Sequence, residues 1–433
     1  MNARARNFLK TLGPGILFAS TAIGVSHLVQ STRAGALAGW GLVWAVMLAN
    51  VAKYPFFEFG SRYASATGTS LIAGYRKMGK WAAWGFLLLT LLTCFFVLGA
   101  IGLVTASFLD NLFGVSARTG SNTTPSVAIV VIAGSTLILA WGAYAALDRL
   151  VKVIAAVLLI GTVVAFIAAT GHTSPMDVPP PPADFSPWTG AGLAFLIALV
   201  GWMPSAVDLA SWNSIWTLER IAETGYRPTL KQTLREFNWG YWISAGLALL
   251  FLGLGAMILY TDQTALPTGT AAFAAGIVDI YTEALGTWAR PFIAAAAFSA
   301  MLGTIIACLD GYTRSLTASI LSLRHPQETV SQAGVQHLKN RRMERWIGAG
   351  LAAGSLALIL WRPNDIKTLV DIATTLSFLV APFVAAANWR LVTAPDFPAQ
   401  ARPSKGMKAL SVLGMLFLVG FSILYLFEQG GRI

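Results

Sequence analysis

Charged residues are scarce in this chain. Asp, Glu, Lys and Arg make up only 11% of its 433 residues, whereas a typical soluble protein has about 25%. Because 56% of the residues are hydrophobic, the composition excludes an ordinary soluble domain and predicts a polytopic membrane protein. The formal net charge of +11 would suggest nucleic acid for a soluble domain. Here the basic residues are scattered between apolar segments, so we expect the lipid bilayer as the partner and no nucleic acid.

Motifs of enzymes and motors are also missing. The sequence contains no P-loop, Cys-x-x-Cys, His-Glu-x-x-His or Gly-x-Ser-x-Gly pattern, so neither an ATPase motor nor a known catalytic constellation is indicated. Cysteine is limited to Cys94 and Cys308, both inside apolar runs, where we expect two buried thiols and no disulfide. The default expectation is a secondary transporter without a cofactor and not an enzyme. A channel or a receptor embedded in the membrane is the alternative.

Apolar runs long enough to cross a bilayer recur along the whole chain. A spanning helix needs about 20 mostly apolar residues, and we find about eleven such runs with no soluble domain between them. They are residues 12–32, 37–60, 81–112, 125–147, 149–171, 189–213, 237–261, 289–322, 343–361, 366–391 and 407–427. We expect residues 172–188 to form an extended loop and residues 268–288 a helix on the membrane surface.

Lys and Arg concentrate in alternate connections between these runs. With the N-terminus placed in the cytoplasm, basic residues on the cytoplasmic side outnumber those on the other side by roughly four to one. We therefore expect a cytoplasmic N-terminus, an outside C-terminus and a multi-pass protein of the plasma membrane, which is the inner membrane in a bacterium. His27 in the first run and Arg33 directly after it argue against a cleaved signal peptide.

The first run carries polar residues near its middle, where a helix exposed to lipid gains nothing from them. Gly24, Ser26 and His27 lie there, and glycine lowers the cost of unusual backbone dihedral angles. We expect the helix to be broken near Gly24 and its polar residues to face a binding site. The alternative is a packing glycine beside a hydrogen-bonded interior histidine.

The sixth run has breakers at the corresponding place. Gly201 and Pro204 lie about midway, next to Met203, Ser205 and Asp208, and proline removes a backbone donor. Transporters built from inverted repeats often interrupt the first helix of each repeat, and the freed backbone groups bind substrate near the middle of the bilayer. We therefore expect one transporter domain made of two five-helix repeats and an extra helix, at about residues 12–171, 189–391 and 407–427.

Four ionisable residues within the runs could be coupling or structural charges: Lys53, Glu58, Asp310 and Arg314. Asp310 and Arg314 are four residues apart, so they lie on one helix face and could pair. Lys53 and Glu58 are expected to extend toward the cytoplasmic interface. Asp208 is the best candidate for a functional carboxylate because it belongs to the broken helix itself, and His27 is the second candidate for a proton carrier.

With these features the sequence resembles the NRAMP family of proton-coupled divalent-metal transporters over nearly the whole chain. The resemblance lies in Gly-Pro-Gly at 13–15, Ala-Gly-Ala at 34–36, the Leu-Val-Trp and Leu-Ala-Asn ends of 42–50, and Met-Pro at 203–204. It implies an all-α fold of the amino-acid-transporter (LeuT-like) type, with helices one to five and six to ten as inverted repeats.

The metal-binding motifs of that family are absent. The family's Asp-Pro-Gly-Asn is replaced by Gly-Val-Ser-His at 24–27, its Met-Pro-His by Met-Pro-Ser at 203–205, and the Gln of its tenth helix by Thr374. The resemblance therefore implies a divergent branch. The residues expected to line a substrate site are Gly24, Ser26, His27, Gly201, Met203, Ser205, Asp208 and Thr374, with His27, Met203 and Asp208 as candidate metal ligands.

Two substrate classes stay open. A carboxylate, an imidazole, a thioether and backbone carbonyls could hold Mn²⁺, and a site that keeps several waters could hold Mg²⁺. Lys53 or Arg314, if free and facing the cavity, would instead favour a small anionic or zwitterionic solute. We expect a monomer that moves a divalent metal by alternating access, with protons as the coupling ion, and we keep the anionic or zwitterionic solute as the alternative.

Overall fold

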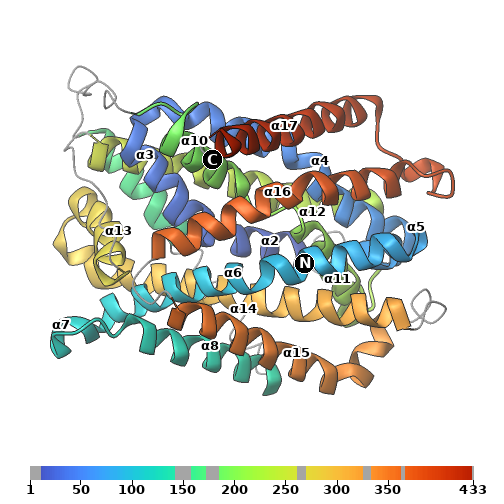
Figure 1. Ribbon diagram of the computed structural model, residues 1–433, viewed down its shortest axis with the longest axis horizontal. Coiled ribbons are helices and arrows are strands. Elements are labelled where there is room, and N and C mark those ends of the chain that lie inside the picture. The colour runs from blue at the N-terminus through green and yellow to red at the C-terminus, as the bar shows by residue number, and fades with distance from the viewer. Residues whose placement is uncertain are drawn as a thin grey trace, which may run out of the picture.

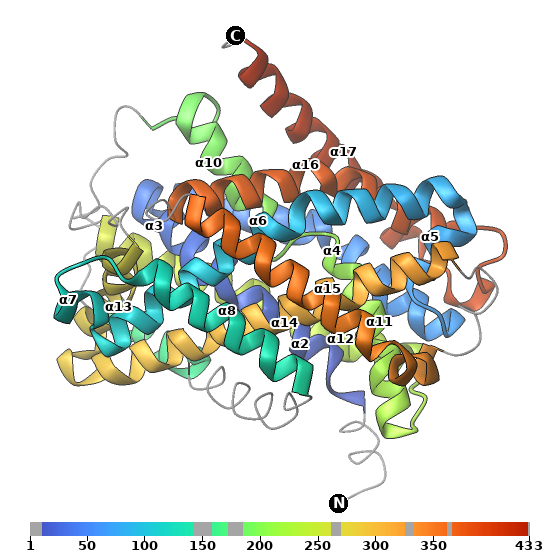
Figure 2. The ribbon, with the colours of Figure 1, turned by 60° about the horizontal axis from the view of Figure 1, so that its bottom comes forward.

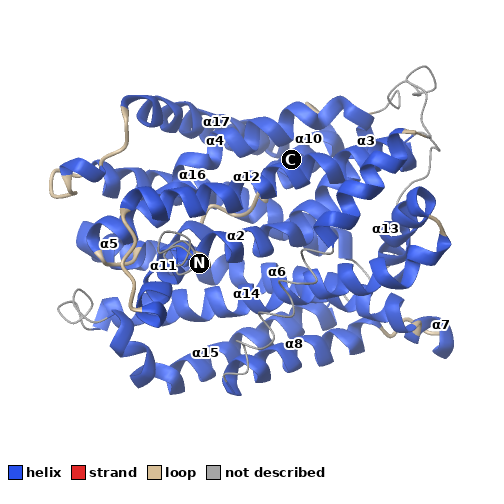
Figure 3. Ribbon diagram, turned by 180° about the vertical axis from the view of Figure 1, so that it is seen from behind, coloured by secondary structure: helices blue, strands red, loops and turns tan. Residues whose placement is uncertain are grey.

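The computed structural model describes residues 11–141, 158–171, 185–260, 270–324, 333–361 and 366–431. Within these ranges the chain forms helices joined by loops and contains no strand (Figure 3). The long helices lie side by side along the longest axis of the molecule (Figure 1). At one edge lies α17 (Lys405–Gly430), and at the opposite edge lie α8 (Thr124–Trp141) and α15 (Ala333–Trp361).

The elements follow one another in this order. The first half contains α2 (Pro14–Ala22), the π-helical η1 (Ile23–Ser31), α3 (Thr32–Ala38), the 3-10 turn η2 (Gly39–Leu42), α4 (Val43–Thr67), α5 (Leu71–Met78), α6 (Lys80–Phe113), α7 (Val115–Thr119), α8 and a helix Leu158–Thr170. The second half contains α10 (Gly190–Gly201), α11 (Leu209–Thr224), α12 (Leu230–Leu254), η3 (Gly255–Tyr260), α13 (Thr270–Leu285), η4 (Thr287–Ala289), α14 (Arg290–Arg324), α15, α16 (Ile366–Thr393), η6 (Ala399–Ala401) and α17.

Local sequence signals explain where several of these helices begin and end. The hydroxyl of Thr229 accepts a hydrogen bond from the Gln232 amide while the Gln232 side chain accepts one from the Thr229 amide, a reciprocal cap that starts α12. Ser70 caps α5 in the simpler one-way form. At the end of α4, Gly68 takes a left-handed conformation with φ of 68°, which glycine adopts at little cost.

In the part of the chain that the structure describes, eight helical stretches are long and apolar enough to cross a membrane. The longest, Pro14–Thr67, has 54 residues and contains most of the first predicted run and all of the second. Leu158–Thr170 and Gly190–Gly201 are apolar but shorter; the first adjoins residues 142–157, which lie outside the described part of the chain. The prediction of an all-α polytopic membrane protein is confirmed, whereas the number of spans and the boundaries of the two repeats stay predictions.

The core is built around α6 and α14, which pack against each other and against most of the other long helices. The edge helices α8, α15 and α17 instead expose large apolar side chains such as Val130, Leu360 and Leu416. Exposed apolar surface of this kind suits a lipid environment, since the hydrocarbon core of a bilayer is itself apolar. Both cysteines are buried and free, as predicted.

The segment predicted to lie on the membrane surface forms the helix α13 at one end of the molecule (Figure 2). Phe273, Ile277 and Tyr281 on this helix are buried, and the helix contacts α6, α14 and η3. The helix itself is confirmed, and its position relative to a membrane surface stays a prediction. Of the predicted loop at 172–188, residues 172–184 lie outside the described ranges.

Candidate functional site

The first predicted break is present at Gly24. This residue has φ of −62° and ψ of −125°, a non-helical conformation between α2 and the rest of η1. Its Cα faces α14 so closely that a Cβ at this position would lie 2.5 Å from Thr304 Oγ1. The Thr304 hydroxyl donates a hydrogen bond of 3.1 Å to the Ser20 carbonyl. The missing side chain at Gly24 therefore lets the first helix bend against α14.

The second predicted break is longer. The helix α10 ends at Gly201 and α11 begins at Leu209, so residues 202–208 lie outside regular helix. Pro204 supplies no backbone donor, and the Met203–Pro204 peptide bond is cis. Gly201 packs directly on α16, where a Cβ would overlap the carbonyl oxygen of Thr374. This break therefore combines a lost backbone donor with a close helix–helix contact.

Carbonyl groups freed by the second break accept hydrogen bonds from side chains of the first two helices. Lys53 Nζ on α4 donates to the Gly201 carbonyl at 2.8 Å and to the Ser205 carbonyl at 3.1 Å. Ser26 Oγ in η1 donates to the Pro204 carbonyl at 3.1 Å. The two breaks are thus joined directly.

His27 is fully buried, and both of its ring nitrogens have hydrogen-bond partners. Nδ1 lies 2.9 Å from Ser26 Oγ. Nε2 lies 2.8 Å from the Ser244 carbonyl and 3.0 Å from the Ser244 hydroxyl on α12. Binding a metal through either nitrogen would require one of these contacts to break, so the arrangement matches the hydrogen-bonded interior histidine that the sequence left as the alternative.

Asp208 stands at the start of α11, is partly buried and does not cap the helix with its side chain. No side chain in the described ranges forms an ion pair or a hydrogen bond with its carboxylate. Lys53 is close enough to interact with it electrostatically, and the surrounding residues include Cys308 and Tyr312 of α14. Among the predicted site residues, Asp208 is therefore the carboxylate placed at the break without a side-chain partner in the described ranges.

The remaining predicted site residues contribute little free polar surface. Met203 is fully buried and Ser205 nearly so. The Thr374 hydroxyl is used within α16, where it donates to the Val370 carbonyl at 2.8 Å and the Asp371 carbonyl at 3.1 Å. Within the described ranges no group of three or more His, Cys, Asp or Glu residues is arranged to hold a metal ion.

The prediction for Lys53 and Glu58 was wrong. Neither side chain extends to an interface, since both are buried. Glu58 pairs with Arg62 on the next turn of α4, at 2.5 and 2.8 Å, and Arg62 also donates to the Ala401 carbonyl at 2.7 Å. Arg62 lies nearer to Glu58 along the helix face than Lys53 does, because an i,i+4 pair meets on a helix and an i,i+5 pair does not.

Asp310 and Arg314 form the predicted pair. Arg314 Nε lies 2.6 Å from Asp310 Oδ1. Arg314 also lies 3.4 Å from Glu219, and Asp310 accepts a hydrogen bond of 3.2 Å from Trp216 Nε1. Since Glu219 and Trp216 belong to α11, this cluster ties α14 to the second half of the broken helix.

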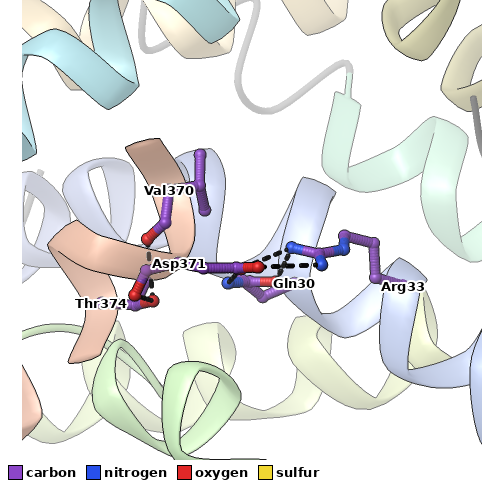
Figure 4. A network of polar contacts seen from close by, with 5 residues as sticks. All are labelled: Gln30, Arg33, Val370, Asp371 and Thr374. Atoms are coloured by element: carbon purple, nitrogen blue, oxygen red, sulfur yellow. Dashed lines mark hydrogen bonds and ion pairs between the residues drawn. The ribbon is translucent and has the colours of Figure 1, made fainter. Parts of the chain in front are cut away.

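A polar network that the sequence did not reveal joins α3 to α16 (Figure 4). Arg33 Nη1 lies 2.9 Å from Asp371 Oδ1 and 2.8 Å from Gln30 Oε1. The Arg33 guanidinium also stacks over the ring of Phe195 on α10, 5.0 Å from its centroid. The three contacts hold together the parts of α3, α10 and α16 that lie on one side of the breaks.

A second network missed from the sequence holds the start of the first helix. The Glu236 carboxylate on α12 accepts hydrogen bonds from the amides of Gly13 at 3.0 Å and Gly15 at 2.8 Å. An anion is favourable at a helix N-terminus because the first amides there lack partners within the helix. These contacts link residues more than two hundred positions apart, so no local sequence pattern could have indicated them.

Two interrupted helices that meet inside a helical bundle are the arrangement found in transporters of the LeuT fold. The model of the Nramp family (natural resistance-associated macrophage protein-like) matches residues 15–428, and the chain belongs to this family. The chain is 34% identical to the uncharacterised protein PM0681 of Pasteurella multocida (strain Pm70), over 97% of this chain and 92% of that one.

Solved transporters share this fold at low sequence identity. The manganese transporter of Eremococcus coleocola superposes with a TM-score of 0.68 at 15% identity, over 98% of this chain and 87% of that chain. Mhp1, a nucleobase-cation-symport-1 family transporter, superposes with a TM-score of 0.57 at 15% identity, over 97% and 92%. The similarity extends over most of each chain, so it concerns the whole arrangement of helices.

Proposed function

We propose that this protein is a secondary transporter that moves a divalent metal ion by alternating access around the breaks at Gly24 and at residues 202–208. Membership of the Nramp family supports this proposal, and so does the manganese transporter among the similar structures. The observation that carries it is Asp208, a partly buried carboxylate beside an unwound segment, with no described side chain paired to it. A carboxylate inside a membrane is costly and usually marks an ion pathway.

In this proposal Asp208 supplies the anionic ligand and the Met203 thioether the soft one. A carboxylate suits Mn²⁺ and Mg²⁺ alike, whereas a thioether favours the softer transition metal. Transport is coupled to protons, with Asp208 as the carrier. The monomer lies in the plasma membrane with its N-terminus in the cytoplasm. The contacts of Arg33 close the helix bundle on one side of the breaks, and the contacts of Glu236 close it on the other side. During transport one of these two sides opens at a time.

Uptake of Mn²⁺ and Mg²⁺ into proteoliposomes tests this function. Asp208→Asn keeps the shape but removes the charge, and we expect uptake to fall by at least about tenfold, the equivalent of 1.4 kcal/mol of lost binding. Met203→Leu conserves volume and should lower Mn²⁺ uptake more than Mg²⁺ uptake. Glu223→Gln is the control, since that carboxylate is exposed on α11. Unchanged Mn²⁺ and Mg²⁺ uptake in Asp208→Asn, or none by the unmodified protein, would refute the proposal.

The Lys53 ammonium favours a second candidate, transport of a small anionic or zwitterionic solute. It is a buried cation at the second break without a carboxylate in ion-pair contact among the described residues. A solute carboxylate could bind there. A thermal-shift screen with Mn²⁺, Mg²⁺, amino acids and small anions separates the two candidates, because a bound ligand raises the unfolding temperature by mass action.

A further inference from the structure

Lys53 holds an unusual position for a charged side chain in an apolar helix. It is fully buried, and its ammonium group makes its hydrogen bonds to two backbone carbonyls, those of Gly201 and Ser205. Buried charges are normally paired with an opposite charge or placed in a functional site. Glu58, the acidic residue nearest in sequence, is instead committed to Arg62.

The two carbonyls belong to different parts of the break. Gly201 is the last residue of α10, and Ser205 lies in the unwound segment. Their oxygens are directed at one point, the ammonium nitrogen, at distances of 2.8 and 3.1 Å. Two converging carbonyl oxygens with Asp208 in electrostatic range form the kind of oxygen-rich environment that binds small cations.

We propose that the carbonyls of Gly201 and Ser205 form a cation subsite and that the Lys53 ammonium of the chain itself occupies it. The lysine then acts as a tethered cation. Its ammonium group donates hydrogen bonds to these two carbonyls of the broken helix when no ion is bound, and it excludes free cations from their oxygens. In a metal transporter, which is the function proposed above, an incoming ion reaches this subsite only when the ammonium group withdraws. Lys53 is therefore a specificity-determining residue.

Removing the lysine should open the subsite to an external cation. Lys53→Ala leaves a space of the size of the lost side chain, which methylammonium can enter. We expect Lys53→Ala to have a lower unfolding temperature than the unmodified protein and to regain it with methylammonium chloride but not with choline chloride, whose cation is too large. Lys53→Met fills the space with an apolar chain of similar length and should show no response to methylammonium. Lys77→Ala, which removes an exposed lysine on α5, is the control.

Binding of Mn²⁺ provides the second readout and does not depend on the Ala variant being stable. Titration followed by electron paramagnetic resonance should show at least about tenfold tighter Mn²⁺ binding in Lys53→Gln than in the unmodified protein, because a like charge beside the ion is removed. The amide of Gln keeps a donor for one carbonyl, so this variant should fold. Unchanged Mn²⁺ binding in Lys53→Gln, or a folded Lys53→Ala that does not respond to methylammonium, would overturn the assignment.

The two proposals fail in different ways. If the unmodified protein transports neither Mn²⁺ nor Mg²⁺ but methylammonium stabilises Lys53→Ala, the subsite stands and the metal-transport function falls. If the unmodified protein transports metal and the Lys53 variants show no change in cation binding, the function stands and the tethered-cation assignment falls.

Discussion

The two breaks in this transporter differ in how much helix each one loses. Around Gly24 the helix changes to π-helical winding and departs from helical dihedral angles at one residue, and it then continues through Ser31 into α3. Between Gly201 and Leu209 the regular helix stops altogether. Glycine permits a bend without forcing one, whereas Pro204 removes a donor and clashes with the preceding turn. The different breakers thus explain the different lengths of the two breaks.

The breaks also differ in which side chains form hydrogen bonds with their backbone carbonyl groups. In the first break the Ser26 hydroxyl contacts the Ala22 carbonyl one turn earlier. In the second break the carbonyls of Gly201, Pro204 and Ser205 receive hydrogen bonds from Lys53 and from Ser26, both far away in the sequence. The first break therefore resembles a hinge, and the second offers backbone oxygens to a partner. This contrast predicts which substitutions the protein tolerates.

Among substitutions at the breaks, we expect the largest loss of stability from a side chain added at Gly201. A Cβ there would overlap the backbone carbonyl of Thr374 on α16, and a backbone cannot rotate away as a side chain can. We expect Gly201→Ala to destabilise the protein by about 3 kcal/mol, the upper end for overpacking, measured by thermal unfolding in detergent. Gly246→Ala on α12, which has open space around its Cα, is the control and should be neutral or stabilising. Equal stability of the two variants would contradict the close contact of α10 with α16.

A smaller effect is expected at Gly24. There a Cβ would lie 2.5 and 2.6 Å from Oγ1 and Cγ2 of Thr304, which Thr304→Ala removes, and 2.9 Å from the Thr304 Cβ, which stays. We expect Gly24→Ala to cost about 1.5 kcal/mol by overpacking and the double variant Gly24→Ala, Thr304→Ala to recover part of this loss, since the Cβ of residue 304 stays close. A double-mutant cycle measured by thermal unfolding would show the coupling. Purely additive effects would mean that Thr304 is not the residue that requires a glycine here.

The smallest effect is expected at Ser26, the hydroxyl that joins the two breaks. Ser26→Ala removes the hydrogen bond to the Pro204 carbonyl together with the contacts to the Ala22 carbonyl and His27 Nδ1, and it should cost roughly 1 kcal/mol more than a substitution that removes only a local bond, the typical net value of one hydrogen bond. Ser319→Ala is the matched control, because that buried hydroxyl bonds only within α14, to the Ser315 carbonyl. If both variants unfold at the same temperature, the link between the breaks contributes nothing measurable beyond a local bond.

Much of this fold could be predicted from local features of the sequence. The apolar runs, the breakers Gly24 and Pro204 and the pair of Asp310 with Arg314 each depend on residues within a few positions of one another. Such features follow from helix geometry, proline chemistry and the solvent properties of lipid. The same reasoning failed for Lys53, because a side chain of this length can reach several partners and only the packing of α4 against the second break decides among them.

The candidate site was less predictable than the fold. The sequence placed His27 and Asp208 on broken helices, but it could not show that Ser26 and Ser244 occupy both nitrogens of His27 while no described side chain pairs with Asp208. The contacts of Arg33 with Asp371 and of Glu236 with Gly13 join segments from opposite parts of the chain. Long-range contacts of this kind leave no periodic pattern, so one sequence cannot reveal them.

The sequence by itself determined that this protein spans a membrane as helices and that two of those helices are interrupted, because burial in lipid and backbone hydrogen bonding act on each segment separately. Only the tertiary structure decided which groups meet at the interruptions. The carbonyls of the second break face a lysine from another helix instead of open space, and that outcome depends on how α4, α10 and α16 pack together.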